Sequence, residues 1–152
     1  MKELKEGNKT PAFSLMSASG KKVNSKDLLG KKMVLYFYPK DMTSGCTLEA
    51  QDFRDNIDSF KRKKTIVLGI SPDSIERHRK FMEKEDLNFE LLSDDDHKVS
   101  EKYGVWKEKS MYGRKYMGIE RSTFIIDTEG RIQKIYRKVK VPGHIDEVLE
   151  NI

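Results

Sequence analysis

The chain contains two continuous apolar runs, KMVLYFY at residues 32–38 and TIVLGIS at residues 65–71. A run of this length, rich in β-branched and aromatic residues, is typical of a strand buried on both faces. Over residues 45–64, apolar side chains recur every three to five positions, which predicts one helix of roughly five turns. Residues 72–86 begin with Pro, Asp and Ser and continue with a second helical pattern. Together these segments predict a βαβα unit.

Turn residues divide the rest of the chain into shorter elements. We expect an edge strand at 11–15, a short helix at 24–30, a strand at 88–94, a short helix at 97–104, a hairpin of strands at 122–127 and 131–137, and a final helix at 142–152. Asn24 or Ser25 is the expected cap of the first short helix, and Gly30 its end. Residues 105–120 follow neither period, so we expect a loop that packs over other elements. Strands alternating with helices predict an α/β fold.

The composition favours a folded domain with a mixed surface. The 152 residues contain no repeat or linker, which predicts one domain over residues 1–152. The net charge of +5 comes from 30 basic and 25 acidic residues spread along the whole chain, which argues against nucleic acid as a partner. The basic cluster at residues 61–64 is either a phosphate or membrane patch or the solvated last turn of a helix. We favour the helix end, where cations complement the helix dipole.

No segment of the sequence has the pattern of a membrane span or a secretory signal. The longest apolar run, residues 33–38, is far shorter than the ~18 residues that a span needs. The first ten residues lack an apolar core and a cleavage site, so the cytoplasm is the expected compartment. His78, His97 and His144 do not combine with the lone cysteine at any recognised ligand spacing, and we expect surface histidines and no metal or cofactor.

Cys46, the single cysteine, falls in the first turn of the helix predicted at residues 45–64. A thiol is a nucleophile only as its thiolate, which is a minor form of an ordinary cysteine at pH 7. The helix end contributes roughly 0.3 to 1 kcal/mol toward the anion, and up to about 2 kcal/mol when sheltered. That is too little to ionise most of the thiol, so an arginine is expected beside it. The alternative is an inert buried cysteine.

Two residues before Cys46 have both a structural and a chemical interpretation. Thr43 has a hydroxyl that can contact a thiolate or a substrate oxygen, and it also fits the N-cap of the helix; the two roles are compatible. Pro39 ends the strand at residues 32–38, and its ring would also shield a thiolate from water and remove a competing N–H.

The segment FYPKDMTSGCTLEAQDFRD resembles the active-site segment of the peroxiredoxins, with Pro39, Thr43 and Cys46 at the matching positions. VLGISPDS, KYGVW and MYGRKYMGIERSTFIID are similar to the PrxQ branch, also called bacterioferritin comigratory protein, so the resemblance covers nearly the whole chain. It implies a thioredoxin-like fold with a central mixed β-sheet flanked by helices. It also implies that Arg121, just before a predicted strand, is the arginine beside Cys46.

The resemblance implies reduction of hydrogen peroxide and organic hydroperoxides without a metal or flavin. The Cys46 thiolate would attack one peroxide oxygen and become a sulfenic acid as water or alcohol leaves. Thr43 and Arg121 would hold the peroxide oxygens and stabilise the charge that builds on them. Glu49 either orients Arg121 or is simply an acidic partner of the helix dipole.

The chain departs from the family pattern at Gln51, where many PrxQ proteins have a resolving cysteine. An internal disulfide is impossible with one cysteine, so the sulfenic acid must be reduced by an external thiol, whether a small thiol, thioredoxin, glutaredoxin or another copy's Cys46. Dithiol exchange within one chain is excluded. The family branch implies a monomer. Two alternatives stay open, a peroxide sensor or chaperone partner that uses the same thiol, and a binding module without enzymatic activity.

Overall fold

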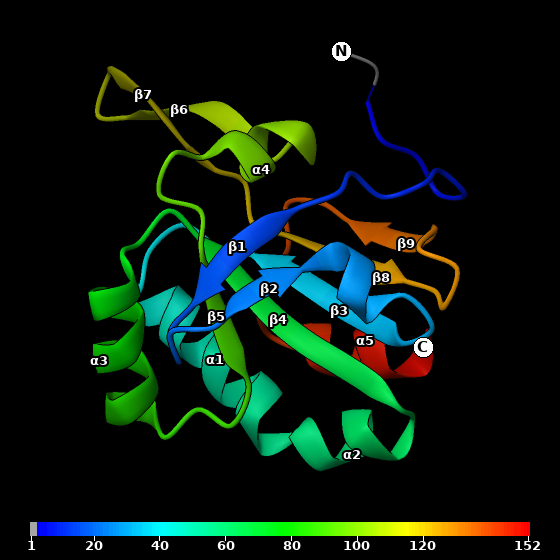
Figure 1. The fold of residues 1–152 in the computed structure, drawn as a ribbon. Helices are drawn as coiled ribbons and strands as arrows, with labels where there is room; N and C mark the ends of the chain where they lie inside the picture. Colours follow the sequence, from blue (N-terminus) through cyan, green and yellow to red (C-terminus); the bar gives the residue numbers. More distant parts are fainter. Residues whose placement is uncertain (1–2) are drawn as a thin grey trace.

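The computed structural model describes residues 3–152 and shows a seven-stranded sheet with helices on both faces, together with a separate two-stranded hairpin (Figure 1). The strands are β1 Ser14–Ser17, β2 Lys22–Asn24, β3 Lys32–Phe37, β4 Thr65–Ser71, β5 Glu90–Ser93, β6 Trp106–Met111, β7 Arg114–Ile119, β8 Ser122–Ile126 and β9 Ile132–Tyr136. The helices are the 3-10 helix η1 Ser25–Leu28 and the α-helices α1 Ser44–Asp55, α2 Ile57–Arg62, α3 Ile75–Glu85, α4 Lys98–Lys102 and α5 His144–Glu150.

The large sheet has the strand order β2-β1-β5-β4-β3-β8-β9 and is mixed. β3 pairs parallel to β4, and β4 parallel to β5, whereas β8 runs antiparallel to both β3 and β9. The parallel pair β3–β4 joined by α1 and α2 confirms the predicted βαβ connection. The expected central mixed sheet flanked by helices is therefore confirmed.

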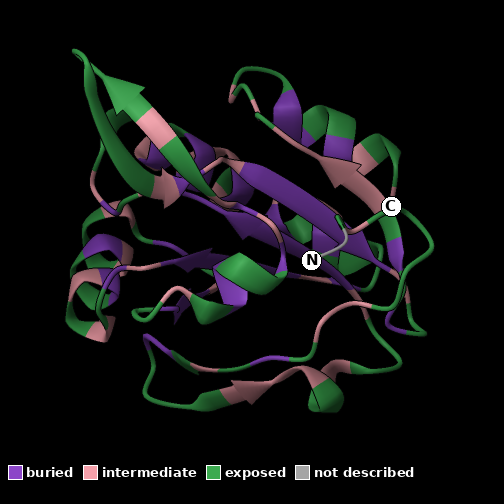
Figure 2. Cartoon of the chain, turned by 90° about the horizontal axis from the view of Figure 1, so that it is seen from above, coloured by how far each residue is buried: buried purple, intermediate pink, exposed green. Residues whose placement is uncertain are grey.

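Two hydrophobic layers cover the two faces of the sheet. On one face, Val34 and Tyr36 of β3 pack with buried residues of α1, α2, α3 and α5. On the other face, Leu35 and Phe37 pack with the α4 region and the N-terminal segment. Because neighbouring side chains of β3 point into opposite layers, the strand has no polar face, and its sequence is a continuous apolar run. Figure 2 shows these central strands buried, in contrast to the projecting hairpin.

The helix predicted over residues 45–64 is interrupted. Asn56 ends α1 and precedes α2, with φ −112° and ψ 8°. Its backbone N–H bonds to the Phe53 carbonyl at 3.1 Å, and its side-chain amide bonds to the Asp52 carbonyl at 2.8 Å. An asparagine that satisfies backbone groups locally competes with a continuous helix, which explains the break. The apolar spacing was still informative, since Phe53 and Phe60 lie in the same core.

The prediction of a loop over residues 105–120 was wrong, because β6 and β7 form an antiparallel hairpin there. Most of its side chains are exposed on both faces, so the sequence lacks the period-two alternation of a half-buried strand. Tyr112 and Gly113 form the two-residue turn with φ 52° and 78°, as tight hairpin turns require. This Tyr-Gly pair was the available signal.

The shorter elements largely match the prediction. The strand predicted at 11–15 lies slightly later, at β1, and it is not an edge strand, because β1 pairs with β5 on one side and with the unpredicted edge strand β2 on the other. The predicted short helix at 24–30 is η1, and its cap is Asn24, which accepts a hydrogen bond from Lys26 N–H at 3.1 Å. The hairpin predicted at 122–127 and 131–137 is β8–β9. Within residues 3–152, no helix is both long and apolar enough to cross a membrane.

Gly69 of β4 is the position where a methyl group is expected to cost most. A Cβ there would lie 2.8 Å from both Leu91 Cδ2 and Tyr36 Cζ, closer than real contacts allow. We expect Gly69→Ala to lower the free energy of unfolding by about 1 to 3 kcal/mol through overpacking. Chemical denaturation measures this. Gly118→Ala on β7 is the matched control, since its Cβ would meet Lys109 at an ordinary 3.4 Å. Equal stability of the two variants would contradict the prediction.

Candidate active site

Cys46 lies where β3 gives way to α1. After Phe37 ends the strand, Tyr38 N–H still donates to the Ile70 carbonyl at 3.1 Å, and residues 38–43 then form a short loop. α1 begins at Ser44, so Cys46 occupies its first turn, close to the unpaired N–H groups of the helix end. The cysteine is only 2% exposed. A thiol in this place is sheltered and faces the positive end of the helix dipole.

Arg121 lies beside this thiol although it is 75 residues away in the sequence. It directly precedes β8, and the antiparallel register pairs Ser122 with Phe37, so the residue before β8 meets the end of β3. One guanidinium nitrogen, Nη2, donates to Cys46 Sγ at 3.3 Å. A positively charged donor in contact with the sulfur can form a charge-assisted hydrogen bond to negative charge on that atom.

Glu49 holds the other side of the Arg121 guanidinium. Its Oε1 accepts a hydrogen bond from Nη1 at 2.6 Å, and its side chain is 1% exposed. Burial raises the pKa of the Glu49 carboxyl from 4.5 to about 7, and the Arg121 charge offsets that rise only in part. Burial works to lower the pKa of Arg121, but Glu49 and Cys46 outweigh it and raise that pKa. Of the two roles considered for Glu49, orienting Arg121 is the one that its geometry supports.

Gly45 gives the guanidinium room over the first turn of α1. A Cβ at this position would lie 3.3 Å from Arg121 Nη2, which is tighter than most contacts. A side chain at position 45 would therefore displace the Arg121 guanidinium from the Cys46 sulfur.

Thr43 and Pro39 lie in the short segment between β3 and α1, a few residues before Cys46. Thr43 is the N-cap residue of α1, but its Oγ1 donates to the Lys40 carbonyl at 2.8 Å, and within residues 3–152 it accepts no hydrogen bond from the helix N–H groups. Thr43 therefore occupies the predicted N-cap position, but its side chain does not form the hydrogen bond of an N-cap. Thr43 is exposed, and its oxygen keeps lone pairs for a ligand. Pro39 is half-buried in the loop, after β3 has ended.

Lys109 of β6 is a residue near the site that the sequence did not indicate. Burial lowers the pKa of Lys109, and the nearby Arg121 charge lowers it further, while Cys46 and Glu120 act in the opposite direction. The hairpin thus brings a second positive group close to Cys46 and Arg121. Nothing in the spacing of residues 105–120 distinguished this lysine from its exposed neighbours.

The prediction of three surface histidines was wrong for two of them. His78 is fully buried, and its ring nitrogens are hydrogen-bonded to Asp41 and to the Leu92 carbonyl. His144 is 4% exposed and hydrogen-bonded to Thr123, and burial together with the Arg121 charge lowers the pKa of His144 to about 4. Both are buried because the fold supplies polar partners, which a sequence window does not show. His97 is half-exposed and stacks on Trp106.

Gln51, at the position of a resolving cysteine in many PrxQ proteins, lies on α1 and points to α3. Its side-chain amide donates to Glu85 Oε1 at 2.7 Å. This bond joins α1 to α3 at the position where many PrxQ proteins have their second cysteine.

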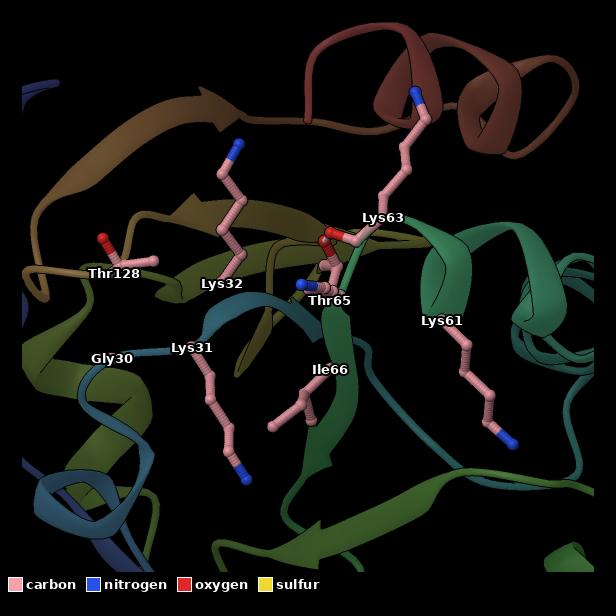
Figure 3. Close-up of a pocket in the computed structure, with 9 residues that line it drawn as sticks. Gly30, Lys31, Lys32, Lys61, Lys63, Thr65, Ile66 and Thr128 are labelled. Carbon is pink, nitrogen blue, oxygen red and sulfur yellow. Dashed lines mark hydrogen bonds between the residues drawn. The ribbon is translucent and has the colours of Figure 1, made fainter.

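A cavity of about 600 Å³ lies at the other end of β3 and β4 from Cys46 (Figure 3). Five of its lining side chains are lysines, at positions 31, 32, 61, 63 and 64. Figure 3 shows Lys31, Lys32, Lys61 and Lys63 pointing in different directions, and Lys63 Nζ donates to the Leu149 carbonyl at 2.8 Å. The ammonium groups therefore do not converge on one ligand. Lys61 lies in the last turn of α2, as expected for cations at a helix end.

Comparison with known proteins places the chain in a family. The family model described as "AhpC/TSA family" matches residues 7–135. Peroxiredoxin Bcp of Bacillus subtilis is 53% identical over 146 residues, covering 96% of this chain and 93% of the relative. Peroxiredoxin Bcp of Escherichia coli K12 is 48% identical over 149 residues, covering 98% and 96%.

Solved structures give the same result. A mutant of Xylella fastidiosa PrxQ superposes with a TM-score of 0.93 at 37% identity, covering 99% of this chain and 96% of that one. Xanthomonas campestris bacterioferritin comigratory protein, described for its alkyl peroxide reduction activity, superposes with a TM-score of 0.87 at 40% identity, covering 91% and 88%. The chain therefore belongs to the AhpC/TSA family and is a peroxiredoxin of the Bcp/PrxQ type, a thiol-dependent peroxidase with a single cysteine.

Proposed function

We propose that Cys46 is the peroxidatic residue of this peroxiredoxin. The thiolate attacks the nearer oxygen of a hydroperoxide, an S–O bond forms and the O–O bond breaks. The sulfur loses two electrons and becomes a sulfenic acid, while the departing oxygen takes a proton and leaves as water or an alcohol. The single observation that carries this proposal is the 3.3 Å contact between Arg121 Nη2 and Cys46 Sγ.

The other site residues have roles that follow from their positions. Arg121, held by Glu49, stabilises the thiolate before the attack and the negative charge that moves onto the peroxide oxygens during it. The exposed Thr43 hydroxyl holds a peroxide oxygen through its free lone pairs or after rotating away from the Lys40 carbonyl. Pro39 shields the thiolate from water and presents no N–H that would compete for it.

The substrate class comprises hydrogen peroxide and small organic hydroperoxides. The thiolate needs only an O–O bond aligned with the sulfur, and nothing in the attack depends on a particular group at the far oxygen. The alkyl peroxide reduction activity described for the Xanthomonas campestris relative supports the inclusion of organic hydroperoxides.

An external thiol completes the cycle. One thiol attacks the sulfenic sulfur, which forms a mixed disulfide and releases water, and a second thiol attacks that disulfide and restores Cys46. The candidates are thioredoxin, glutaredoxin and small thiols. Because Cys46 is only 2% exposed, a small thiol has the easier approach to the folded site, whereas a protein thiol requires the first turn of α1 to open.

Turnover with a supplied thiol tests this function and separates it from a peroxide sensor. We expect each chain to consume many equivalents of hydrogen peroxide when a thiol is in excess, with separate assays using thioredoxin, glutaredoxin and a small thiol. Without a thiol we expect one equivalent to be consumed and the protein mass to increase by one oxygen atom. Consumption that stops after one equivalent with every thiol favours the sensor, and slow oxidation like that of free cysteine favours a binding module.

Residues 1–152 are proposed to act as one domain and as a monomer in the cytoplasm. The seven-stranded sheet combines strands from both ends of the chain, including β1 and β9. Cys46, Arg121 and Glu49 contact one another within one chain. A single monomeric species in sedimentation velocity of the reduced protein is the expected result. A dimer that disappears on reduction would instead be joined through Cys46.

A further inference from the structure

The loop that leads into Cys46 is held at one residue, Asp41. Its backbone N–H donates to Asp73 Oδ2 at 2.8 Å, and its carbonyl accepts from Arg77 Nη2 at 3.1 Å. Its buried carboxylate accepts from the Tyr38 hydroxyl at 2.5 Å and lies 2.6 Å from His78 Nδ1. The backbone and the side chain of Asp41 are thus both bound to groups on α3, in the connection between β4 and α3, and just after β3.

His78 is oriented by acceptors on both sides of its ring. Nε2 lies 2.9 Å from the Leu92 carbonyl oxygen, which can only accept, so Nε2 carries a hydrogen. At 2.6 Å, Nδ1 and Asp41 Oδ2 must share one proton, whether it is formally on the ring or on the carboxyl group. His78 therefore connects the loop to β5 through two hydrogen bonds, in a fully buried place where water cannot replace them.

The residue after Asp41 is strained. Met42 has a φ of 65°, in the left-handed region that a residue with a long side chain rarely adopts. Such a conformation costs on the order of 1 to 3 kcal/mol and persists only where the surrounding contacts enforce it. Thr43 and then α1 follow directly. The contacts of Asp41 lie next to this turn and so fix the direction in which the chain enters the first turn of α1.

The same side chains bring potential metal ligands together, but their contacts favour a protein network. Ligand atoms of Asp41, Asp73 and His78 lie within 4.8 Å of one another. The carboxylate of Asp73 already accepts from the Ser71 hydroxyl at 2.6 Å and from Arg77 Nε at 3.1 Å, and Asp41 and His78 bind each other. An ion would have to displace these donors, including a guanidinium.

We propose that Asp41 and His78 are positioning residues for peroxide reduction, which rests on the function proposed above. Their hydrogen bond holds the Met42 turn and thereby places the Thr43 hydroxyl and the Cys46 sulfur at the correct separation for a peroxide. They do not touch the thiol, whose negative charge depends on Arg121 and Glu49. A displacement of about 1 Å in such a geometry can lower a rate by 10².

Two rates measured on the same variants test this proposal. The rate constant for hydrogen peroxide depends on both the thiolate and its position relative to Thr43, whereas alkylation by iodoacetamide at pH 7 depends mainly on the thiolate. We expect His78→Ala and Asp41→Ala to lower the peroxide rate constant about tenfold or more and to change the alkylation rate by less than about threefold. Asp41→Asn should stay within about threefold of wild type in both, since its amide can accept from Tyr38 and donate to neutral His78.

Tyr103→Phe is the control for the loss of a buried hydrogen bond. Its hydroxyl donates to the Pro11 carbonyl at 2.9 Å on the other face of the sheet, so we expect a lower melting temperature and an unchanged peroxide rate. Circular dichroism at the assay temperature establishes that each variant is folded. If His78→Ala does not fold, His78→Gln takes its place, because it keeps an amide donor toward Asp41. We expect His78→Gln to fold and to lose less of the peroxide rate than Asp41→Ala.

Each outcome decides one question. A peroxide rate unchanged in folded His78→Ala would overturn the positioning role, as would equal losses in Asp41→Asn and Asp41→Ala. Parallel losses in the peroxide and alkylation rates would also overturn it, since the variants would then act through the thiolate itself. Failure of the wild-type protein to turn over would count against the proposed function instead.

The hydrogen bond itself has an expected spectroscopic signature. The wild-type protein should show a slowly exchanging downfield imidazole N–H proton, and His78→Gln should remove this signal.

Discussion

Replacing Arg121 by Gln is expected to lower the rate constant for hydrogen peroxide by about 10² to 10³, the usual effect of removing a donor that stabilises developing negative charge. Two interactions are lost together. The Cys46 sulfur loses the Nη2–H donor at 3.3 Å, and Glu49 loses its partner at 2.6 Å. Because Glu49 is buried, losing this hydrogen-bond partner should also lower the free energy of unfolding by about 1 to 3 kcal/mol, with the carboxyl taking up a proton. Stopped-flow kinetics and chemical denaturation measure the two effects.

Two further variants separate the charge of Arg121 from its effect on stability. Adding Glu49→Gln to Arg121→Gln removes the buried carboxyl group that has lost its partner, so stability should recover while the peroxide rate stays low. Arg121→Lys keeps the charge but cannot contact sulfur and carboxylate with two separate nitrogens, so it should fall between wild type and Arg121→Gln. Cys46→Ser defines the background rate. If Arg121→Gln is folded and within threefold of wild type, the electrostatic role assigned to Arg121 is wrong.

The stability of the wild-type protein is expected to decrease between about pH 4.5 and pH 7 because of Glu49. Its pKa is about 7 in the folded chain against 4.5 ordinarily, so the folded state binds this proton more tightly than the unfolded state. The stabilising contribution is complete below pH 4.5 and is lost as the pH rises through 7. The difference between the two pKa values corresponds to about 3 kcal/mol.

Comparison with Glu49→Gln isolates this contribution from the other titrating groups. Gln cannot ionise, but its amide oxygen can still accept from Arg121 Nη1, so the geometry of the site is largely kept. Denaturation of both proteins across pH 4 to 8 should give curves that diverge, with only the wild type losing the Glu49 contribution as the pH rises. Curves that stay parallel over this range would contradict a raised pKa for Glu49.

The strands and helices near the site were predictable because their signals are local. β3 and β4 appear as apolar runs, since each is buried on both faces by layers that run the length of the strand. The position of Cys46 in the first turn of α1 followed from the apolar spacing that begins just after it. The sequence failed where local pattern and structure diverge, as in the exposed hairpin β6–β7 and at the Asn56 break.

The residues that contact the thiol were harder to predict from the sequence. From the residues alone, only the need for an arginine beside Cys46 could be stated, and its assignment to Arg121 came from the family resemblance. Glu49 was considered for two roles, and its contact with Arg121 distinguishes them. The burial of His78 was mispredicted, because its polar partners lie on a loop and a strand distant in the sequence.

The sequence by itself determined that one thiol stands at the start of a helix after a buried strand, and that no second cysteine in the chain can resolve it. These properties depend on composition and on residues within a few positions of Cys46. The tertiary structure decided which charges surround the thiol and what holds its loop. Arg121 meets Cys46 only through the antiparallel register of β3 and β8, and Asp41 meets His78 only because α3 packs beside the end of β3. Contacts between distant segments depend on how strands pair and helices pack, and the local spacing of residues does not encode them.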